Sequence, residues 1–164
     1  MADIGSTNAR FGWVDAREGG AITRVSTLPT AAHADIAAAV RAYLGQVAAE
    51  LGDRWQPPQR AAFAVATAVA GDWVEFTNSP WRFSARQLQI DLGLRSLQVL
   101  NDFEALALAL PRLSSGQFRP HGRAPDAAGT LAVVGPGTGL GVAGVTRAHD
   151  GSWVALAGEG GHCT

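Results

Sequence analysis

The first 29 residues alternate apolar and polar side chains around a turn at Arg17–Gly20. A period of two is typical of strands that bury one face, so this stretch predicts strands joined by a hairpin. From His33 to Leu51 the period changes, and apolar side chains recur every three or four positions. That spacing predicts an amphipathic helix. The proline pair Pro57–Pro58 cannot continue a helix, so we expect it to have ended by then.

Strand-like and helix-like segments alternate further along the chain. The expected elements are a buried strand at 61–70, a short hairpin within 71–84, a short helix capped by Ser84 and stopped by Gly93, a strand at 97–100 and a helix from Glu104 to near Pro111. This alternation predicts an α/β domain with a mixed, partly parallel sheet.

The opening pattern returns after a polar segment at 114–129 that is rich in glycine and proline. Both "DIGSTNARFGWV" and "GPGTGLGVAGV" place glycine and a hydroxyl residue after a strand, and each is followed by two further strands. Such self-similarity predicts a weak internal duplication. We therefore expect an N-terminal α/β domain at 1–113, a linker at 114–129, and the first hairpin strands of an incomplete second domain at 130–164.

Composition narrows the class of protein. The 164 residues are 47% hydrophobic and 16% charged, which suits a packed core. The 13 basic and 14 acidic residues give a net charge of -1 without a basic run, which argues against a nucleic-acid or anionic-membrane partner. Cys163 is the only cysteine, so an intrachain disulfide is excluded. We find no secretory signal and no apolar run long enough to cross a bilayer, and expect a soluble, cytoplasmic protein.

One glycine motif is misleading. Gly139–Gly144 formally fits the G-x-G-x-x-G fingerprint, and Glu159 lies at about the distance of a ribose-binding acid. A dinucleotide-binding fold needs a helix directly after the glycines, where the pyrophosphate meets its N-terminus. Here the residues that follow alternate with period two and turn at Asp150–Gly151, so a hairpin is expected instead. We reject the dinucleotide interpretation.

Two glycine-containing turns remain candidates for holding phosphate. The backbone amides of a hairpin tip can bind an anion, and Gly5–Asn8 and Gly137–Gly141 both fit this description. The alternative is that each is an ordinary tight turn. Asp3, just before the first tip, is a candidate for positioning Mg²⁺ through water, because hard divalent ions prefer carboxylate oxygens. The alternative for Asp3 is a solvated acid near the N-terminus.

Asn101 and Asp102 stand between the expected strand at 97–100 and the helix that follows. Ligands in open α/β sheets bind beyond the C-terminal ends of the strands, so this pair is placed where a site is expected. The alternative is that one of the two merely caps the helix, and the two roles are not exclusive.

Four segments, taken in order, resemble the bacterial glucokinases of the hexokinase branch of the actin-like ATPase superfamily. "ADIGSTNARFGWV" and "GPGTGLGVA" are similar to that family's two phosphate loops. "GDWVEFTNSPWRFS" with "LQVLNDFEALALALP" is similar to its sugar-binding segment, and "LAGEGGH" to its later sugar-binding turn. The resemblance implies a ribonuclease H-like fold of two similar α/β domains that close over a hexose and Mg-ATP.

The resemblance also implies roles for individual residues. Asp102 would be the general base for the sugar 6-hydroxyl. The implied sugar-binding residues are Asn101, Asp102, Glu159, His162 and, as a weaker match, Asn78. The implied phosphate-binding residues are Gly5, Ser6, Thr7, Asn8, Gly137, Thr138 and Gly139, and Asp3 would bind the water shell of Mg²⁺. Ser6 stands where the family usually has a second glycine, which is a departure from the pattern.

The function expected from this resemblance is ATP-dependent phosphorylation of glucose. Members of the family are considerably longer than this chain, so we expect an incomplete glucokinase with little or no activity alone and a tendency to form homodimers. Two alternatives stay open: a non-catalytic sugar-binding or regulatory half-domain, and a kinase of another hexose.

Overall fold

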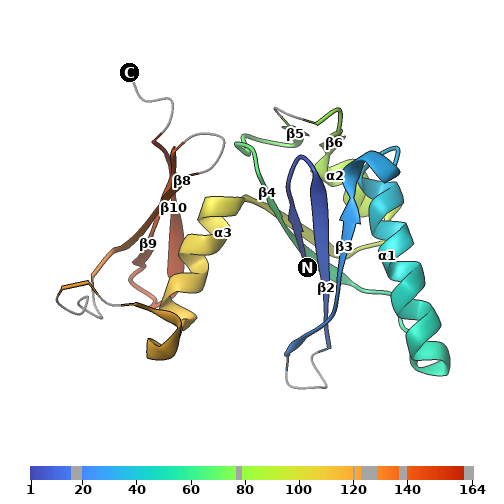
Figure 1. The fold of residues 1–164 in the computed structure, drawn as a ribbon, viewed down its shortest axis with the longest axis horizontal. Helices are drawn as coiled ribbons and strands as arrows, with labels where there is room; N and C mark the ends of the chain where they lie inside the picture. The colour runs from blue at the N-terminus through green and yellow to red at the C-terminus, as the bar shows by residue number, and fades with distance from the viewer. Residues whose placement is uncertain (16–19, 77–78, 120, 123–128, 137–139, 161–164) are drawn as a thin grey trace. The chain divides into compact units, whose positions relative to one another are not determined.

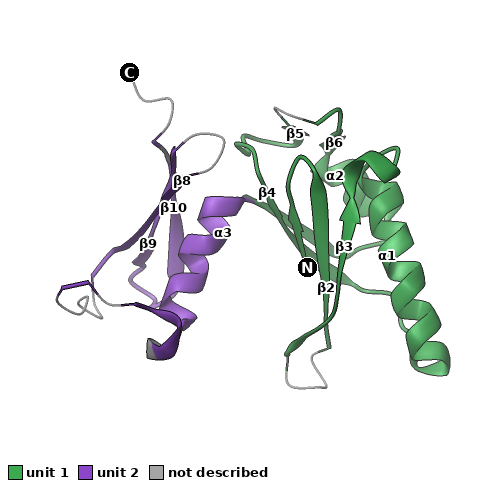
Figure 2. Cartoon of the chain, viewed as in Figure 1, with its two compact units in different colours: residues 1–100 green, residues 101–164 purple. Residues whose placement is uncertain are grey.

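The computed structural model describes residues 1–164 except 16–19, 77–78, 120, 123–128, 137–139 and 161–164. The chain divides into two compact units, residues 1–100 and residues 101–164 (Figure 2). In chain order, the strands and α-helices are β1 (Ala2–Ile4), β2 (Asn8–Val14), β3 (Ile22–Pro29), α1 (Ile36–Leu51), β4 (Arg60–Val65), β5 (Trp73–Glu75), β6 (Arg82–Ser84), α2 (Ala85–Asp91), β7 (Ser96–Asn101), α3 (Asp102–Ala109), β8 (Leu131–Pro136), β9 (Leu140–Arg147) and β10 (Trp153–Glu159) (Figure 1).

The first unit is built on a five-stranded sheet with the order β3-β2-β1-β4-β7. β1 pairs antiparallel with β2 and parallel with β4, which confirms the predicted mixed sheet. The alternation read from the sequence is visible in β2, where Ala9 and Phe11 are buried while Asn8 and Arg10 are exposed. Successive side chains of a strand point to opposite faces, so the even and odd positions separate in this way.

Helix α1 covers part of this sheet through the apolar face that the sequence predicted. Its buried residues include Ile36, Val40, Tyr43 and Val47, and the ring of Tyr43 stacks on that of Phe11 at 5.1 Å between centroids. The predicted helix began at His33, but α1 begins at Ile36 because Asp35 is its N-cap. The Asp35 carboxylate accepts from the backbone N–H of Ala38 at 2.7 Å.

Strand β4 is shorter than the sequence suggested. We expected a strand over 61–70, whereas β4 ends at Val65. Its partner β1 has only three residues, in the register Ala2↔Phe63 and Ile4↔Val65. A single further hydrogen bond, from the Ala66 N–H to the Ile4 carbonyl, extends the ladder before β1 gives way to the first glycine turn. β4 therefore ends where its ladder with β1 ends, and apolarity alone did not reveal this.

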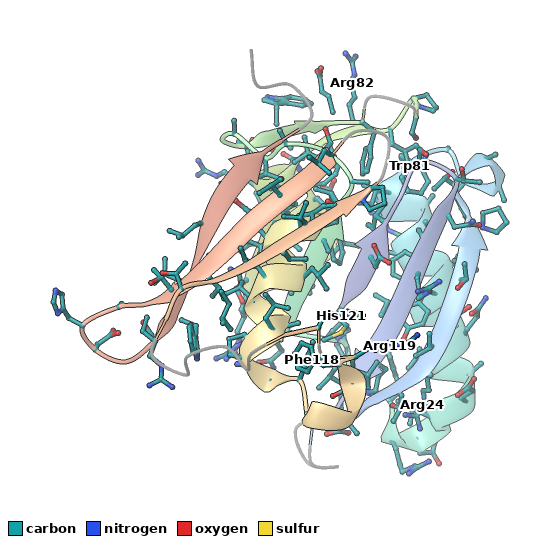
Figure 3. The ribbon with its side chains drawn as sticks, turned by 60° about the vertical axis from the view of Figure 1, so that its left-hand side comes forward. Arg24, Trp81, Arg82, Phe118, Arg119 and His121 are labelled. Carbon is teal, nitrogen blue, oxygen red and sulfur yellow. The ribbon has the colours of Figure 1, made fainter. Side chains whose placement is uncertain are left out.

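The predicted short hairpin and capped helix are both confirmed. β5 and β6 pair antiparallel, and the Ser84 hydroxyl accepts from the N–H of Gln87 at the start of α2. The helix ends at Asp91, two residues before Gly93, which has a φ of +65° and so suits the left-handed position after a helix. Trp81, labelled in Figure 3, is buried and donates from its indole N–H to the His33 carbonyl at 3.3 Å.

The second unit consists of a three-stranded antiparallel sheet, in the order β10-β9-β8, with α3 packed on one face. Ala107, Ala143 and Val145 form its buried centre. The order is the same as that of β3-β2-β1 in the first unit, and in both cases a glycine-containing segment lies between the first two strands in the sequence. The predicted repeat of three strands is thus present, and β9 follows Gly139 directly, where a dinucleotide-binding fold would need a helix.

Helix α3 belongs with the strands that follow it. The two compact units meet between Leu100 and Asn101, earlier than the predicted division at 113/114, because α3 packs on β8, β9 and β10. The predicted division into 1–113, 114–129 and 130–164 stays a prediction for the domains of the whole fold.

Within the described residues, no helix is both long enough and apolar enough to cross a membrane.

Candidate functional site

Asn101 and Asp102 mark the point where β7 ends and α3 begins. This is the junction that the sequence predicted, and the backbone of Asn101 is still extended, with φ -61° and ψ 149°. Asp102 is the first residue of the helix. The unpaired N–H groups and aligned peptide dipoles at this end of a helix favour negative charge, so the carboxylate of Asp102 is well placed.

The cap that we considered as an alternative is present. The Asn101 side-chain oxygen accepts from the Phe103 N–H at 2.9 Å, and the Asp102 carboxylate accepts from the same N–H at 2.9 Å. The Asn101 N–H in turn donates to the Glu104 carboxylate at 3.3 Å, which completes a capping box. Asn101 is thereby fixed in place, and a cap of this kind is compatible with the predicted role of Asp102.

The aromatic ring of Phe103 connects this helix start to the sheet. A Cβ atom placed on Gly135 would lie 3.1 Å from the ring, and one placed on Gly141 would overlap the ring edge. Gly135 is in β8 and Gly141 in β9, and the two pair directly across the ladder. They are the glycines on either side of the predicted phosphate loop at 137–139. The ring therefore packs against both strands at the base of that loop.

Strand β10 carries another predicted site residue, Glu159, at the same end of the sheet as Gly135 and Gly141. In the register of β9 and β10, Gly141 pairs with Glu159. Gly135, Gly141 and Glu159 consequently form one row across the three strands, at the end of the sheet beside the 137–139 loop. The second unit thus brings together the backbone of three separate predicted segments, one of which carries Asp102.

The first glycine turn is held by hydrogen bonds to its carbonyl groups. The Gly5 N–H donates to the Asn8 carbonyl at 2.9 Å, which closes the turn between β1 and β2. Thr30 is buried and donates twice, from its hydroxyl to the Ser6 carbonyl at 2.6 Å and from its N–H to the Thr7 carbonyl at 2.9 Å. With the carbonyls of Ser6 and Thr7 tied to Thr30, the loop keeps a fixed shape.

Asp3 is exposed on β1, two residues before this turn, in register with Arg10 of β2. Within the described ranges, no group of three histidine, cysteine or acidic side chains is arranged to hold a metal ion. A single exposed carboxylate suits contact with a hydrated Mg²⁺, which keeps several waters and shares its ligands with substrate phosphates. Asp3 fits that chemistry, and its role stays a prediction.

Several predicted site residues lie outside the described residues. These are Asn78, Gly137, Thr138, Gly139 and His162. For Glu159 only the backbone register is described.

Two residues with a clear part in this geometry were not identified from the sequence. Thr30 and Phe103 both act on segments that are distant along the chain, so local patterns gave no indication of them. For the capping box a signal was present, because Asn101 and Glu104 are three residues apart in the spacing that this motif requires.

Comparison with known proteins places these features in a family. The glucokinase family model matches residues 1–164, the whole of this chain. A glucokinase from Aromatoleum aromaticum is 48% identical over 165 residues, covering 100% of this chain and 48% of the relative. A glucokinase from Neisseria meningitidis serogroup C is 45% identical over 163 residues, covering 99% of this chain and 47% of the relative.

Solved structures agree with the sequence comparison. The crystal structure of a glucokinase from an Antarctic psychrotroph is 37% identical, with a TM-score of 0.81, and the match covers 99% of this chain and 50% of that one. A glucokinase from Balamuthia mandrillaris, solved with glucose, is 21% identical with a TM-score of 0.66 over 99% of this chain and 47% of that one, which shows the shared fold. The chain spans about half the length of the relatives it matches. On its sequence and its fold, the chain belongs to the glucokinase family.

Proposed function

We propose that this chain supplies the general base and the phosphate loops of an enzyme that transfers the γ-phosphoryl group of ATP to the 6-hydroxyl of glucose. The observation that carries the proposal is the placement of Asp102. It begins α3, and the next residue packs on the two glycines that flank the 137–139 loop. Phosphoryl transfer to an alcohol needs a proton acceptor and groups that bind the phosphates, and the strands that Phe103 contacts are those that lead into and out of residues 137–139.

In this mechanism Asp102 accepts the proton of the sugar hydroxyl as its oxygen attacks the phosphorus. Phosphoryl transfer depends mainly on positioning and on neutralising charge, so a base that is fixed at a helix start contributes by its location. The capping box made by Asn101 and Glu104 keeps the first turn of α3 from fraying, which holds the carboxylate in place.

The sugar would be recognised through its hydroxyl groups. Asn101, Asp102, Glu159, His162 and Asn78 form the proposed set. Together these side chains supply both donors and acceptors, which a neutral polyol requires on all sides. The relatives named glucokinase, at 48% and 45% identity, support glucose as the substrate. Hydroxyls at most of the same positions occur in other hexoses, so a related hexose is the second candidate.

The phosphates of ATP would lie against the two glycine turns. Gly5, Ser6, Thr7 and Asn8 form the first, with Thr30 fixing its shape, and Gly137, Thr138 and Gly139 form the second. Bound Mg²⁺ would neutralise charge on the phosphates, and Asp3 would hold its water shell. A chain with these functions needs a supply of ATP, which agrees with a cytoplasmic location.

The test is reconstitution with the half of a relative that this chain does not match. The 164-residue chain is mixed or co-expressed with the part of the Aromatoleum aromaticum glucokinase that it does not match, and ADP formation from Mg-ATP is followed. We expect ADP formation that requires both pieces, a hexose and Mg²⁺, and that stops when the metal is chelated. Glucose, mannose, fructose and N-acetylglucosamine are compared, with glucose expected to be preferred.

If another of these sugars is preferred, the proposed kinase activity stands and that sugar replaces glucose as the proposed substrate. Sugar binding without ADP formation, from a well-folded complex, would favour the non-catalytic half-domain instead.

A further inference from the structure

The glycines at 135 and 141 have a role that the phosphate-loop motif does not explain. Glycine is required where φ is positive or where another group comes too close for a side chain. Neither Gly135 nor Gly141 has a positive φ, so their backbone would accept any residue. They also lie within β8 and β9, in the ladder, outside the loop itself. The close neighbour at both positions is the ring of Phe103.

Phe103 follows Asp102 directly, and its N–H is held by the side chains of Asn101 and Asp102. These hydrogen bonds fix the backbone of Phe103, whose ring contacts the sheet, at the start of α3. Packed interiors transmit displacement because they contain few voids. A ring displaced from the two glycines would strain the first turn of α3, which carries the carboxylate of Asp102.

We propose that Phe103 is a positioning residue. Its ring, seated on Gly135 and Gly141, sets the place of Asp102 relative to the ends of β8 and β9. The effect on catalysis rests on the proposed function. The packing of Phe103 on the two glycines does not depend on it. Glycine occurs at both positions because a larger side chain would occupy the space of the ring. Gly135 and Gly141 pair directly across the ladder, so the ring contacts both.

The variant Gly141→Ala tests the inference in the reconstituted enzyme. A methyl group there would overlap the ring, so the ring must shift, and we expect the first turn of α3 with Asp102 to shift with it. We expect kcat to fall about 10- to 100-fold, because small misplacements of catalytic groups have effects of this size. The KM for glucose should change less than kcat, because Glu159, His162 and Asn78 are also in the proposed sugar-binding set. The control is Gly144→Ala on the same strand, where the nearest atom would be 3.4 Å away and kcat should stay unchanged.

A double variant separates this role from contact with phosphate. Valine at position 103 ends at Cγ and lacks the Cδ2, Cε2 and Cζ atoms that overlap the added methyl. Phe103→Val alone should also lower kcat. In the double variant Phe103→Val/Gly141→Ala, kcat should be no lower than with Phe103→Val alone, because the overlap is gone. If the two losses multiply, or if Gly141→Ala has no effect, the inference is wrong.

A second readout does not depend on activity. In amide ¹H–¹⁵N spectra of the 164-residue chain, Gly141→Ala should shift the signals of residues 101–104, and Gly144→Ala should leave them in place. Unmoved signals at 101–104 would overturn the inference. If the unsubstituted mixture forms no ADP, the proposed function fails, and these spectra still decide whether Phe103 positions the start of α3.

Discussion

At the scale of single residues, the site is held by side chains that contact backbone far away in the sequence. Thr30 reaches back 24 positions to the carbonyl of Ser6, and the Phe103 ring reaches forward to Gly135 and Gly141. Neither contact leaves a local pattern, which is why the sequence predicted the loops and the Asn101–Asp102 pair without the residues that support them. Asn101 lies between a strand and a helix as predicted, and of the two candidates for the cap it is the N-cap residue.

Thr30 offers the clearest test at this scale. Replacing it with valine keeps the shape and removes the hydroxyl, which leaves the Ser6 carbonyl without this donor. We expect Thr30→Val to lower the free energy of unfolding by about 1–3 kcal/mol. Thr30→Ser keeps the hydroxyl and loses one methyl, for about 1 kcal/mol or less. Chemical denaturation of the chain measures both.

The same pair of variants bears on phosphate binding. In the reconstituted enzyme the KM for ATP should rise with Thr30→Val and stay near its original value with Thr30→Ser. If serine is as damaging as valine, the hydrogen bond to Ser6 is not what holds the first loop.

At the scale of elements, helix and strand periods were read correctly from the sequence, and the ends of elements were less certain. The Ser84 cap and the Gly93 stop of α2 came from local chemistry, so both were predictable. The end of β4 coincides with the end of its ladder with β1, a contact distant in sequence, so local patterns did not predict it. A further contact at α2 was also missed, because Asp72 reaches the helix start from outside it. Its carboxylate accepts from the Ser84 hydroxyl at 2.5 Å and from the Arg86 N–H at 2.8 Å.

These bonds predict a pH effect. The Ser84 hydroxyl first, and then the Arg86 N–H, hold the pKa of Asp72 below its ordinary value of 3.8. Because the charged form is favoured in the folded chain, the stabilising contribution is complete above the ordinary pKa. It is lost as the pH falls below 3.8 and through the lowered pKa. A carbon-13 NMR titration of the Asp72 carboxyl should place its midpoint below 3.8.

Ser84→Ala is the matched variant for this titration. It removes the larger cause, so the pKa of Asp72 should rise toward its ordinary value. Asp150, whose pKa is lowered by its own bonds to Ser152, serves as the internal control and should not respond. An Asp72 midpoint that is the same in both proteins would show that the Ser84 hydroxyl is not the cause.

At the scale of the whole molecule, the sheet of the second unit has one covered face and one apolar face open to solvent. α3 covers the side of Val133, Ala143 and Val145. Val134 of β8 and Leu156 of β10 lie on the opposite face of the sheet, where Val134 is 61% exposed and Leu156 is 44% exposed. An open apolar sheet face is a surface that associates with other chains.

We therefore expect the isolated chain to self-associate through this face. Leu156→Lys should reduce association, because it places a charge on the face at an exposed position that tolerates it. Ile90→Lys is the control, since Ile90 is 62% exposed on α2 of the first unit. Sedimentation velocity at two concentrations measures the effect. Association that is equally strong in both variants would rule out the β8–β10 face.

The measurement that tests the central claim most directly is turnover by an Asp102→Asn variant in the reconstituted enzyme. Asparagine has nearly the same shape at the helix start, so the free energy of unfolding should change by no more than about 1 kcal/mol. Loss of the proton acceptor should lower kcat about 100- to 10,000-fold, with a much smaller change in the KM for glucose. Full turnover by a folded Asp102→Asn enzyme would contradict the assignment of Asp102 as the general base.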